Sequence, residues 1–304
     1  MQESAIPSAT LKVRLLQRLS IRRDAQDLES RLSSKARELF CYLLLYRHQT
    51  HHREALATLL WPESDPAKSR QYLRKSLWQL LAALNREADV SAQRVLVLEA
   101  GWISVNPQAD LWIDAAALEQ AFDIVRGIPA ADLEAPTAGL VQQAVDLYLG
   151  HLLEGWYMEW CLLERERLQG MYLLLLDKLI GHCEARGDYE TGLTYGARAL
   201  RCDRASERTH RKLMRLRYLA GDRTGALRQF ERCVAALQEE LGVGPEERTL
   251  ALYREIQGNQ LAVPSGDKSR RTSPSDERGR EPLPASWPLP AEAASTGPAV
   301  VPPT

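Results

Sequence analysis

The segment from residue 66 to residue 86 gathers side chains that could bind a polyanion. It reads PAKSRQYLRKSLWQLLAALNR and contains no acidic residue. Lys and Arg neutralise phosphates, and Arg, Lys and Gln can also hydrogen-bond to base edges in the major groove of DNA. The segment therefore predicts a nucleic-acid-binding surface. Its basic members are Lys68, Arg70, Arg74, Lys75 and Arg86.

Helical winding would place these side chains on one face. Asp65 followed by Pro66 predicts a helix start, because Asp caps helices and proline loses no hydrogen bond at the first position. At about 100° per residue, one stripe is apolar and is expected to be buried: Leu73, Leu77, Leu80 and Leu84. The opposite side carries Lys68, Gln71, Lys75 and Trp78, flanked by Arg70 and Arg74. A solvated basic face is the alternative interpretation, although an outward Trp78 needs a groove, a partner or a hairpin to cover it.

The neighbouring elements favour DNA binding. Two amphipathic helices are expected before the basic one, at 34–46 and 52–60. Two β-rich runs follow it, at 95–98 and 102–105, and the three-residue loop Glu99-Ala100-Gly101 between them predicts a hairpin. Three helices, the last of them basic and exposed, followed by a hairpin, are the order of a winged helix-turn-helix. Arg94 and Gly101 of this wing complete the candidate DNA-binding residues.

The chain divides into three regions. Residues 10–110 hold the winged helix and begin with β-type alternation, which predicts an N-terminal sheet. Residues 111–260 are helical throughout, and Gly-Asp pairs recur 34 residues apart, at 187–188 and 221–222. That period is typical of tetratricopeptide repeats, although a helical bundle with a coincidental pair is the alternative. Residues 261–304 hold nine of the 16 prolines and are expected to form a disordered tail.

Composition and charge exclude other classes. The net charge is −1, but residues 1–110 carry 16 Lys and Arg against 12 Asp and Glu, which gives +4 and leaves −5 for the remainder. No apolar run is long enough for a membrane span, and the N-terminus lacks the pattern of a secretory signal. The five cysteines are well separated and are expected to be reduced and mostly buried, which predicts a cytoplasmic protein.

The sequence contains none of the catalytic motifs that were considered. The sequence lacks GxSxG, HExxH and paired CxxC motifs, so neither catalysis, a metal nor a cofactor is expected. His51-His52 is interpreted as the polar start of the second helix and not as part of a zinc site. Glu164 and Glu166 are interpreted as a solvated helix face and not as a catalytic pair.

These motifs together resemble the SARP-type transcriptional activators, in which an OmpR-type winged helix precedes a bacterial transcriptional activator domain. The resemblance spans about residues 10–258. It rests on SSKARELFCYLLLY (33–46), REALATLLWPESDPAKSRQYLRKSLWQL (53–80), LYLGHLLEGWYMEWCLLERERL (147–168) and LQEELGVGPEERTLALYREI (237–256). It implies a mainly α fold, in which small sheets and three helices precede an all-α, tetratricopeptide-like domain. Since the sequence lacks GxxxxGK[ST], the form without a nucleotide-binding module is expected.

The resemblance also implies partners. Helix 66–85 would enter the major groove of double-stranded DNA and the wing 95–105 the neighbouring minor groove. Protomers would bind head to tail on direct repeats and recruit RNA polymerase through its sigma or alpha subunit. Glu63, on the loop before the basic helix, is the candidate polymerase contact, whereas Trp61 beside it is interpreted as a core anchor. An adaptor whose winged helix has lost DNA binding is the alternative.

Two positions depart from the family pattern. The third helix usually continues with further arginines, where this chain has Gln79, Leu80 and Leu81. The strand opening has Gln17-Arg18, where Gly-Pro is common.

Overall fold

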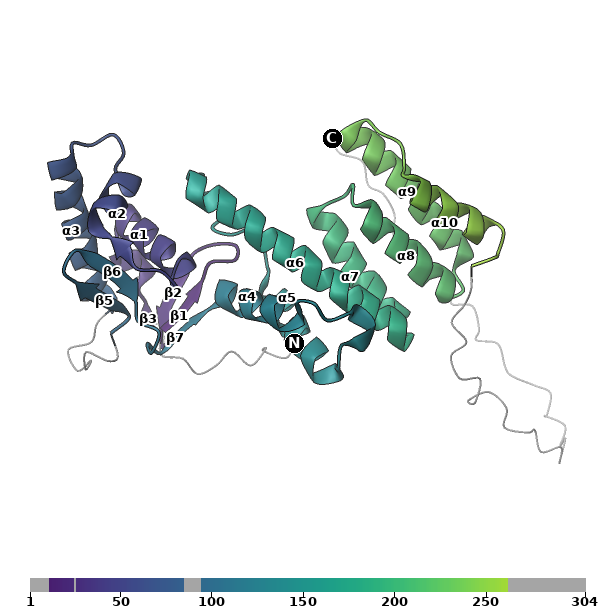
Figure 1. The fold of residues 1–304 in the computed structure, drawn as a ribbon, viewed down its shortest axis with the longest axis horizontal. Coiled ribbons are helices and arrows are strands. Elements are labelled where there is room, and N and C mark those ends of the chain that lie inside the picture. The colour runs from purple at the N-terminus through teal and green to yellow at the C-terminus, as the bar shows by residue number, and fades with distance from the viewer. Residues whose placement is uncertain (1–10, 25, 85–93, 262–304) are drawn as a thin grey trace, which may run out of the picture. The chain divides into compact units, whose positions relative to one another are not determined.

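A computed structural model describes residues 11–24, 26–84 and 94–261. The expected tail beyond residue 261, and the basic Arg86, lie outside the described residues. The described residues belong to one compact unit. They are mainly helical, with two small sheets near the N-terminus, so the expected fold class is confirmed (Figure 1).

The N-terminal part holds three helices and a four-stranded sheet. The helices are α1 (Ser34–Leu45), α2 (Arg53–Leu60) and α3 (Pro66–Leu84), with a 3₁₀ turn, η1 (Glu29–Arg31), before them. The sheet has the order β3 (Gln26–Asp27), β2 (Ser20–Arg23), β1 (Leu11–Arg14) and β7 (Leu111–Ile113). Its pairs are antiparallel except β1 with β7, which is parallel. This is the N-terminal sheet that the β-type alternation predicts.

The wing is a three-stranded sheet, and it corrects two expectations. Its order is β4 (His51–His52), β6 (Trp102–Val105) and β5 (Leu96–Glu99). His51 and His52 lie outside the helical turns of α2: they form β4 and pair with β6, and His52 is the N-cap residue before Arg53. The buried His51 ring lies 3.1 Å from the Tyr46 carbonyl. Glu99 pairs with Trp102, so the hairpin turn has two residues and not three.

The C-terminal part is a stack of helices. They are α4 (Asp114–Val125), α5 (Ala135–Leu147), α6 (Glu159–Arg186), α7 (Tyr189–Cys202), α8 (Glu207–Leu219), α9 (Arg223–Leu241) and α10 (Glu247–Gln257), with a 3₁₀ turn, η3 (Ala130–Asp132), between α4 and α5. Figure 1 shows α6 to α9 as successive antiparallel helices. The all-α character of this part is therefore confirmed.

The 34-residue repeat has a clear structural basis. Gly187 and Gly221 have φ of 74° and 85°, a left-handed conformation that glycine adopts without a steric penalty, and each follows the end of a helix. The Asp after each glycine caps the next helix: Asp188 accepts the Thr191 N–H and Asp222 accepts the Gly225 N–H. The two turns are therefore equivalent, as the tetratricopeptide-like interpretation requires.

The core is continuous across the expected domain boundary. One cluster of buried apolar side chains extends from Leu11 to Leu216. Strand β7, just after the boundary at residue 110, pairs with β1, and an isolated antiparallel bridge joins Leu16 to Leu152. The boundary between residues 110 and 111 stays a prediction.

The expected solvation of the ERER run is wrong for Glu164. Its side chain is buried and pairs with Arg167 at 2.6 Å, whereas Glu166 is exposed. Four of the five cysteines are buried and all five are unpaired. In the described ranges, no helix is long and apolar enough to cross a bilayer, and no group of three or more potential metal ligands occurs.

Candidate nucleic-acid interface

Helix α3 begins where the Asp-Pro pair predicts. The Asp65 carboxylate accepts the Ala67 N–H at 3.1 Å, and the Asp65 carbonyl accepts both the N–H and the hydroxyl of Ser69 at 2.9 Å. Because proline occupies the first helical position, the helix starts at Pro66 without leaving a backbone donor unused there. The cap thus fixes the residue at which α3 begins.

The apolar stripe of α3 anchors the helix against the core. Its four leucines are between 0% and 7% exposed: Leu73, Leu77, Leu80 and Leu84. Helices α1 and α2 both pack on α3. Ser33, which caps α1, donates a hydrogen bond of 2.7 Å to the Gln79 side chain. Gln79 therefore joins α3 to α1, and the buried Leu80 joins it to the core. The resemblance leads us to expect arginines at these two positions.

The opposite side of α3 is an exposed strip, here called the basic strip. It consists of Lys68, Gln71, Arg74, Lys75 and Trp78, all exposed. Side chains three and four residues apart are neighbours on a helix, so the strip is continuous. Trp78 is 71% exposed. The wing does not cover this indole, so a large apolar surface lies among cationic side chains.

One carboxylate from another helix reaches the edge of this surface. Glu54 on α2 lies 3.4 Å from Arg70, and both side chains are more than half exposed. No acidic residue lies within α3, as the sequence shows, but Glu54 of the neighbouring helix partly neutralises Arg70. An exposed pair of this length contributes at most about 1 kcal/mol, so a phosphate could displace Glu54 from Arg70.

The turn of the wing is tied to the start of α2. Gly101 has φ of 83°, as a turn glycine requires, and its carbonyl accepts the Arg53 N–H at 2.9 Å. Trp102 packs edge-on against His52 at 5.1 Å between ring centroids and remains 44% exposed. Arg94 is exposed before β5, and its carbonyl accepts the Asn106 side-chain amide at 2.9 Å. The wing therefore has a fixed backbone with exposed side chains.

The loop between α2 and α3 carries one partly buried aromatic residue, Trp61, and one exposed charged residue, Glu63. Trp61 is partly buried; its ring centroid is 6.0 Å from that of Tyr72, and the Lys35 ammonium lies 5.8 Å from the Trp61 ring. This agrees with the interpretation of Trp61 as a core anchor. Glu63, two residues later, is exposed.

Comparison with known proteins finds one family domain and two similar regulators. Residues 113–257 match the bacterial transcriptional activator domain. The transcriptional regulatory protein MoaR1 of Mycobacterium bovis (strain BCG / Pasteur 1173P2) is 28% identical over 236 residues, which are 73% of this chain and 71% of MoaR1. MoaR1 of Mycobacterium tuberculosis (strain ATCC 25618 / H37Rv) is 27% identical over the same shares. Residues 113–257 thus match the bacterial transcriptional activator domain, and most of the chain is similar to these transcriptional regulators.

A solved structure supports the fold of this chain. The structure described as Mycobacterium tuberculosis EmbR in complex with low affinity phosphopeptide superposes with a TM-score of 0.64. The match covers 84% of this chain and 67% of EmbR, at 18% identity. The two proteins thus share their fold over most of this chain.

Two features of the regulator that join its parts carry no signal in the sequence. Glu119 on α4 accepts hydrogen bonds from Arg47, which follows α1, and from Arg167 on α6. Burial, and then the Glu164 carboxylate, raise the pKa of the neighbouring Tyr46 to about 12. A pattern within one helix cannot reveal an ion pair between residues 72 positions apart.

The second such feature is Asp114, the first residue of α4. Its carboxylate is 2% exposed and accepts the N–H groups of Leu15, Leu16 and Ala115 at 2.8, 3.0 and 2.7 Å. Burial raises the pKa of Asp114 to about 6, although these three hydrogen bonds oppose the shift. The side chain therefore fastens the end of β1 to the start of α4.

Proposed function

We propose that this regulator binds double-stranded DNA with α3 in the major groove and with the wing, residues 95–105, along the neighbouring minor groove. The observation that carries the proposal is the basic strip, an exposed row without an acidic residue on the side of α3 away from the core. A helix with one buried apolar stripe and one exposed cationic strip fits a major groove, which is about 12 Å wide.

The residues divide into two roles. Gln71 and Lys75, at the centre of the basic strip, are positioned for base edges, while Lys68, Arg70 and Arg74 on its ends and flank are suited to phosphates. Trp78 offers the apolar surface that a thymine methyl or a sugar can cover. Arg94 and the turn at Gly101 form the wing contact.

Activation is the expected consequence of binding. In this proposal protomers bind direct repeats near promoters in the cytoplasm, self-associate on DNA and recruit RNA polymerase through sigma or alpha. The exposed Glu63 beside the basic strip is the candidate polymerase contact, since a carboxylate there repels phosphate and is available to a protein. The proposal requires neither a metal, a cofactor nor catalysis.

The competing proposal is a protein-interaction scaffold whose winged helix no longer binds DNA. An electrophoretic mobility shift with DNA from upstream of the regulator's own gene separates the two. A DNA-binding regulator gives a specific shift at about 50 mM salt that weakens by orders of magnitude at about 200 mM, because phosphate contacts release counterions. Absence of a shift at both concentrations would favour the scaffold.

A further inference from the structure

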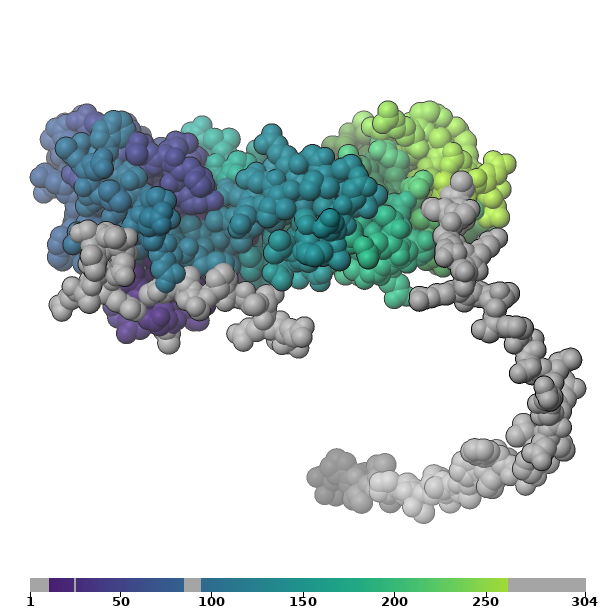
Figure 2. Space-filling view, turned by 60° about the horizontal axis from the view of Figure 1, so that its bottom comes forward, coloured from purple at the N-terminus to yellow at the C-terminus, as the bar shows by residue number. Residues whose placement is uncertain are grey.

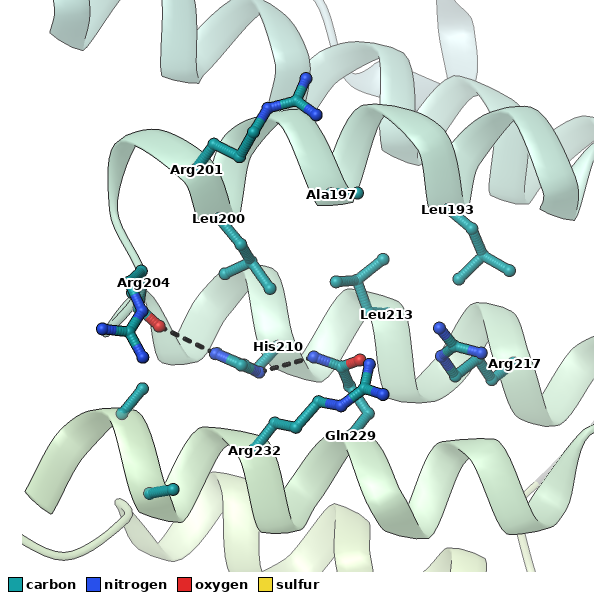
Figure 3. A pocket seen from close by; sticks show the side chains of 12 residues that line it. Leu193, Ala197, Leu200, Arg201, Arg204, His210, Leu213, Arg217, Gln229 and Arg232 are labelled. Atoms are coloured by element: carbon teal, nitrogen blue, oxygen red, sulfur yellow. Dashed lines mark hydrogen bonds between the residues drawn. The ribbon is translucent and has the colours of Figure 1, made fainter. Parts of the chain in front are cut away.

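A cavity lies between three helices of the activator domain, away from α3. It has a volume of about 400 Å³ and is lined by residues of α7, α8 and α9 and of the turn before α8 (Figure 3). Leu193 and Leu200 of α7 and Leu213 of α8 supply apolar surface. Cavities of this size with mainly apolar walls are typical of small-molecule sites.

Cationic side chains surround the apolar surface. Figure 3 shows the guanidinium groups of Arg204, Arg217 and Arg232 around the cavity, whereas that of Arg201 points away from them. Carboxylates on the outer surface already pair with two of the three. Arg204 lies 3.1 Å from Glu239, and Arg217 lies 3.4 Å from Asp222.

Two of these arginines keep unused hydrogen-bond donors. The Nε atom of Arg217 is buried and has no hydrogen-bond partner, although the same side chain reaches Asp222. Arg232 is exposed and pairs with no carboxylate or carbonyl of the described residues. A buried donor without an acceptor is unfavourable, so an anionic group that hydrogen-bonds to Arg217 would stabilise the site.

A buried polar pair holds the floor of the cavity rigid. His210 lies 2.9 Å from the Arg204 carbonyl through Nε2 and 2.8 Å from the Gln229 side-chain amide through Nδ1 (Figure 3). Since Gln229 donates to His210, its side-chain carbonyl remains without a donor from the described residues. One neutral acceptor therefore accompanies the cationic groups.

We infer that this cavity binds a small organic anion with an apolar body, a carboxylate or a phosphate ester, whose head group contacts Arg217 and Arg232. A guanidinium presents paired donors that match both head groups, and the leucines cover the hydrocarbon portion. The site is separate from the basic strip and does not depend on DNA binding. An acidic peptide would need a longer cationic surface than these two unused arginines provide.

The test measures binding of octanoate, octyl phosphate and uncharged octanol to the full chain by ligand-detected NMR titration. Both anions should bind saturably at one site, and octanol should bind at least about tenfold more weakly, because it lacks the charge-assisted hydrogen bonds. Arg217→Gln and Arg232→Gln should each weaken anion binding about tenfold. Arg228→Gln, an exposed arginine of α9 outside the cavity, should leave it unchanged.

A second variant tests the location of the binding site without changing an arginine. Ala197 is exposed and lines the cavity, so Ala197→Glu keeps the fold and adds a carboxylate that competes for the arginines. It should abolish anion binding with an unchanged melting temperature. Failure of both anions to bind, equal binding of octanol, or unchanged binding by Arg232→Gln and Ala197→Glu would overturn the inference, as would binding of an acidic peptide alone.

Discussion

Arg47, two residues beyond the end of α1, donates a hydrogen bond to Glu119 at the centre of α4. The end of α1, the helix that packs on α3, is therefore joined by charge to α4. Arg167 of α6 shares the same carboxylate at 2.5 Å. Arg47 and Glu119 are about one-seventh exposed, so removing Glu119 would leave the Arg47 charge largely buried without a carboxylate partner.

Glu119→Gln should therefore destabilise the regulator. Removing one partner of a buried pair costs about 3–5 kcal/mol, and the partial exposure of Arg167 lowers the expected loss to about 1–3 kcal/mol. Urea unfolding measures the change in the free energy of unfolding. Glu166→Gln is the matched control, because Glu166 is exposed on α6. A loss no larger than that of the control would show that the junction contributes nothing.

Asp114 makes stability depend on pH. Its pKa is about 6 in the folded chain against an ordinary value of 3.8, so the folded chain takes up the proton more readily than the unfolded chain. The resulting contribution is complete below about pH 3.8 and is lost as the pH rises through about 6. The unfolding free energy of wild type minus that of Asp114→Asn should fall by up to about 3 kcal/mol over this window.

The control for this titration is Asp123→Asn, which changes an exposed carboxylate of the same helix. The pH dependence found for Asp114→Asn is compared with that of this control. A difference between wild type and Asp114→Asn that stays constant between pH 4 and pH 7 would mean that Asp114 does not titrate in this range.

Gly101 is expected to be required for its backbone conformation and not for lack of room for a side chain. An added Cβ would lie 3.6 Å from the His52 ring, an ordinary contact, but φ of 83° strains a β-branched residue by about 1–3 kcal/mol. Gly101→Val should distort the wing and weaken DNA binding, whereas Gly101→Asn, which tolerates this φ, should bind nearly as wild type. Fluorescence anisotropy with operator DNA compares them. Equal affinity of the Val variant and wild type would remove the wing from the interface.

Glu63→Lys should separate binding from activation. The change adds a cation beside the basic strip, so DNA affinity should stay the same or rise slightly. Transcription from the target promoter should fall, because the proposed polymerase contact is reversed in charge. Parallel measurements of binding and of transcription in vitro decide the matter. If both fall together, or neither changes, the loop has no separate role in activation.

Local patterns in the sequence predict what depends on local geometry. The apolar stripe of α3, the Asp65 cap and the paired turns at Gly187 and Gly221 follow from helical periodicity and capping chemistry. The surface of α3 is equally readable, because a basic residue opposite a buried stripe has only solvent or a partner to face. These elements carry most of the fold and the candidate interface.

Features that depend on distant partners could not be predicted in this way. His51 and His52 are extended because β6, about 50 residues away, pairs with them. Glu54 reaches Arg70 from another helix, and Glu164 is buried because α6 packs on α4. Gln17 has φ of 102°, which glycine adopts at lower cost, so this backbone fits the Gly-Pro that the resemblance leads us to expect there.

The salt dependence of DNA affinity tests the central claim most directly. Fluorescence anisotropy with operator DNA should show the affinity of wild type falling linearly with salt on logarithmic axes. The double variant Gln71→Ala/Lys75→Ala should fold normally, since both side chains are exposed, and should bind about 10- to 100-fold more weakly with a slope smaller by about 1. Arg228→Ala, which removes an exposed charge from α9, should behave as wild type. A well-folded double variant with wild-type affinity and slope would contradict the assignment of α3 as the DNA-reading helix.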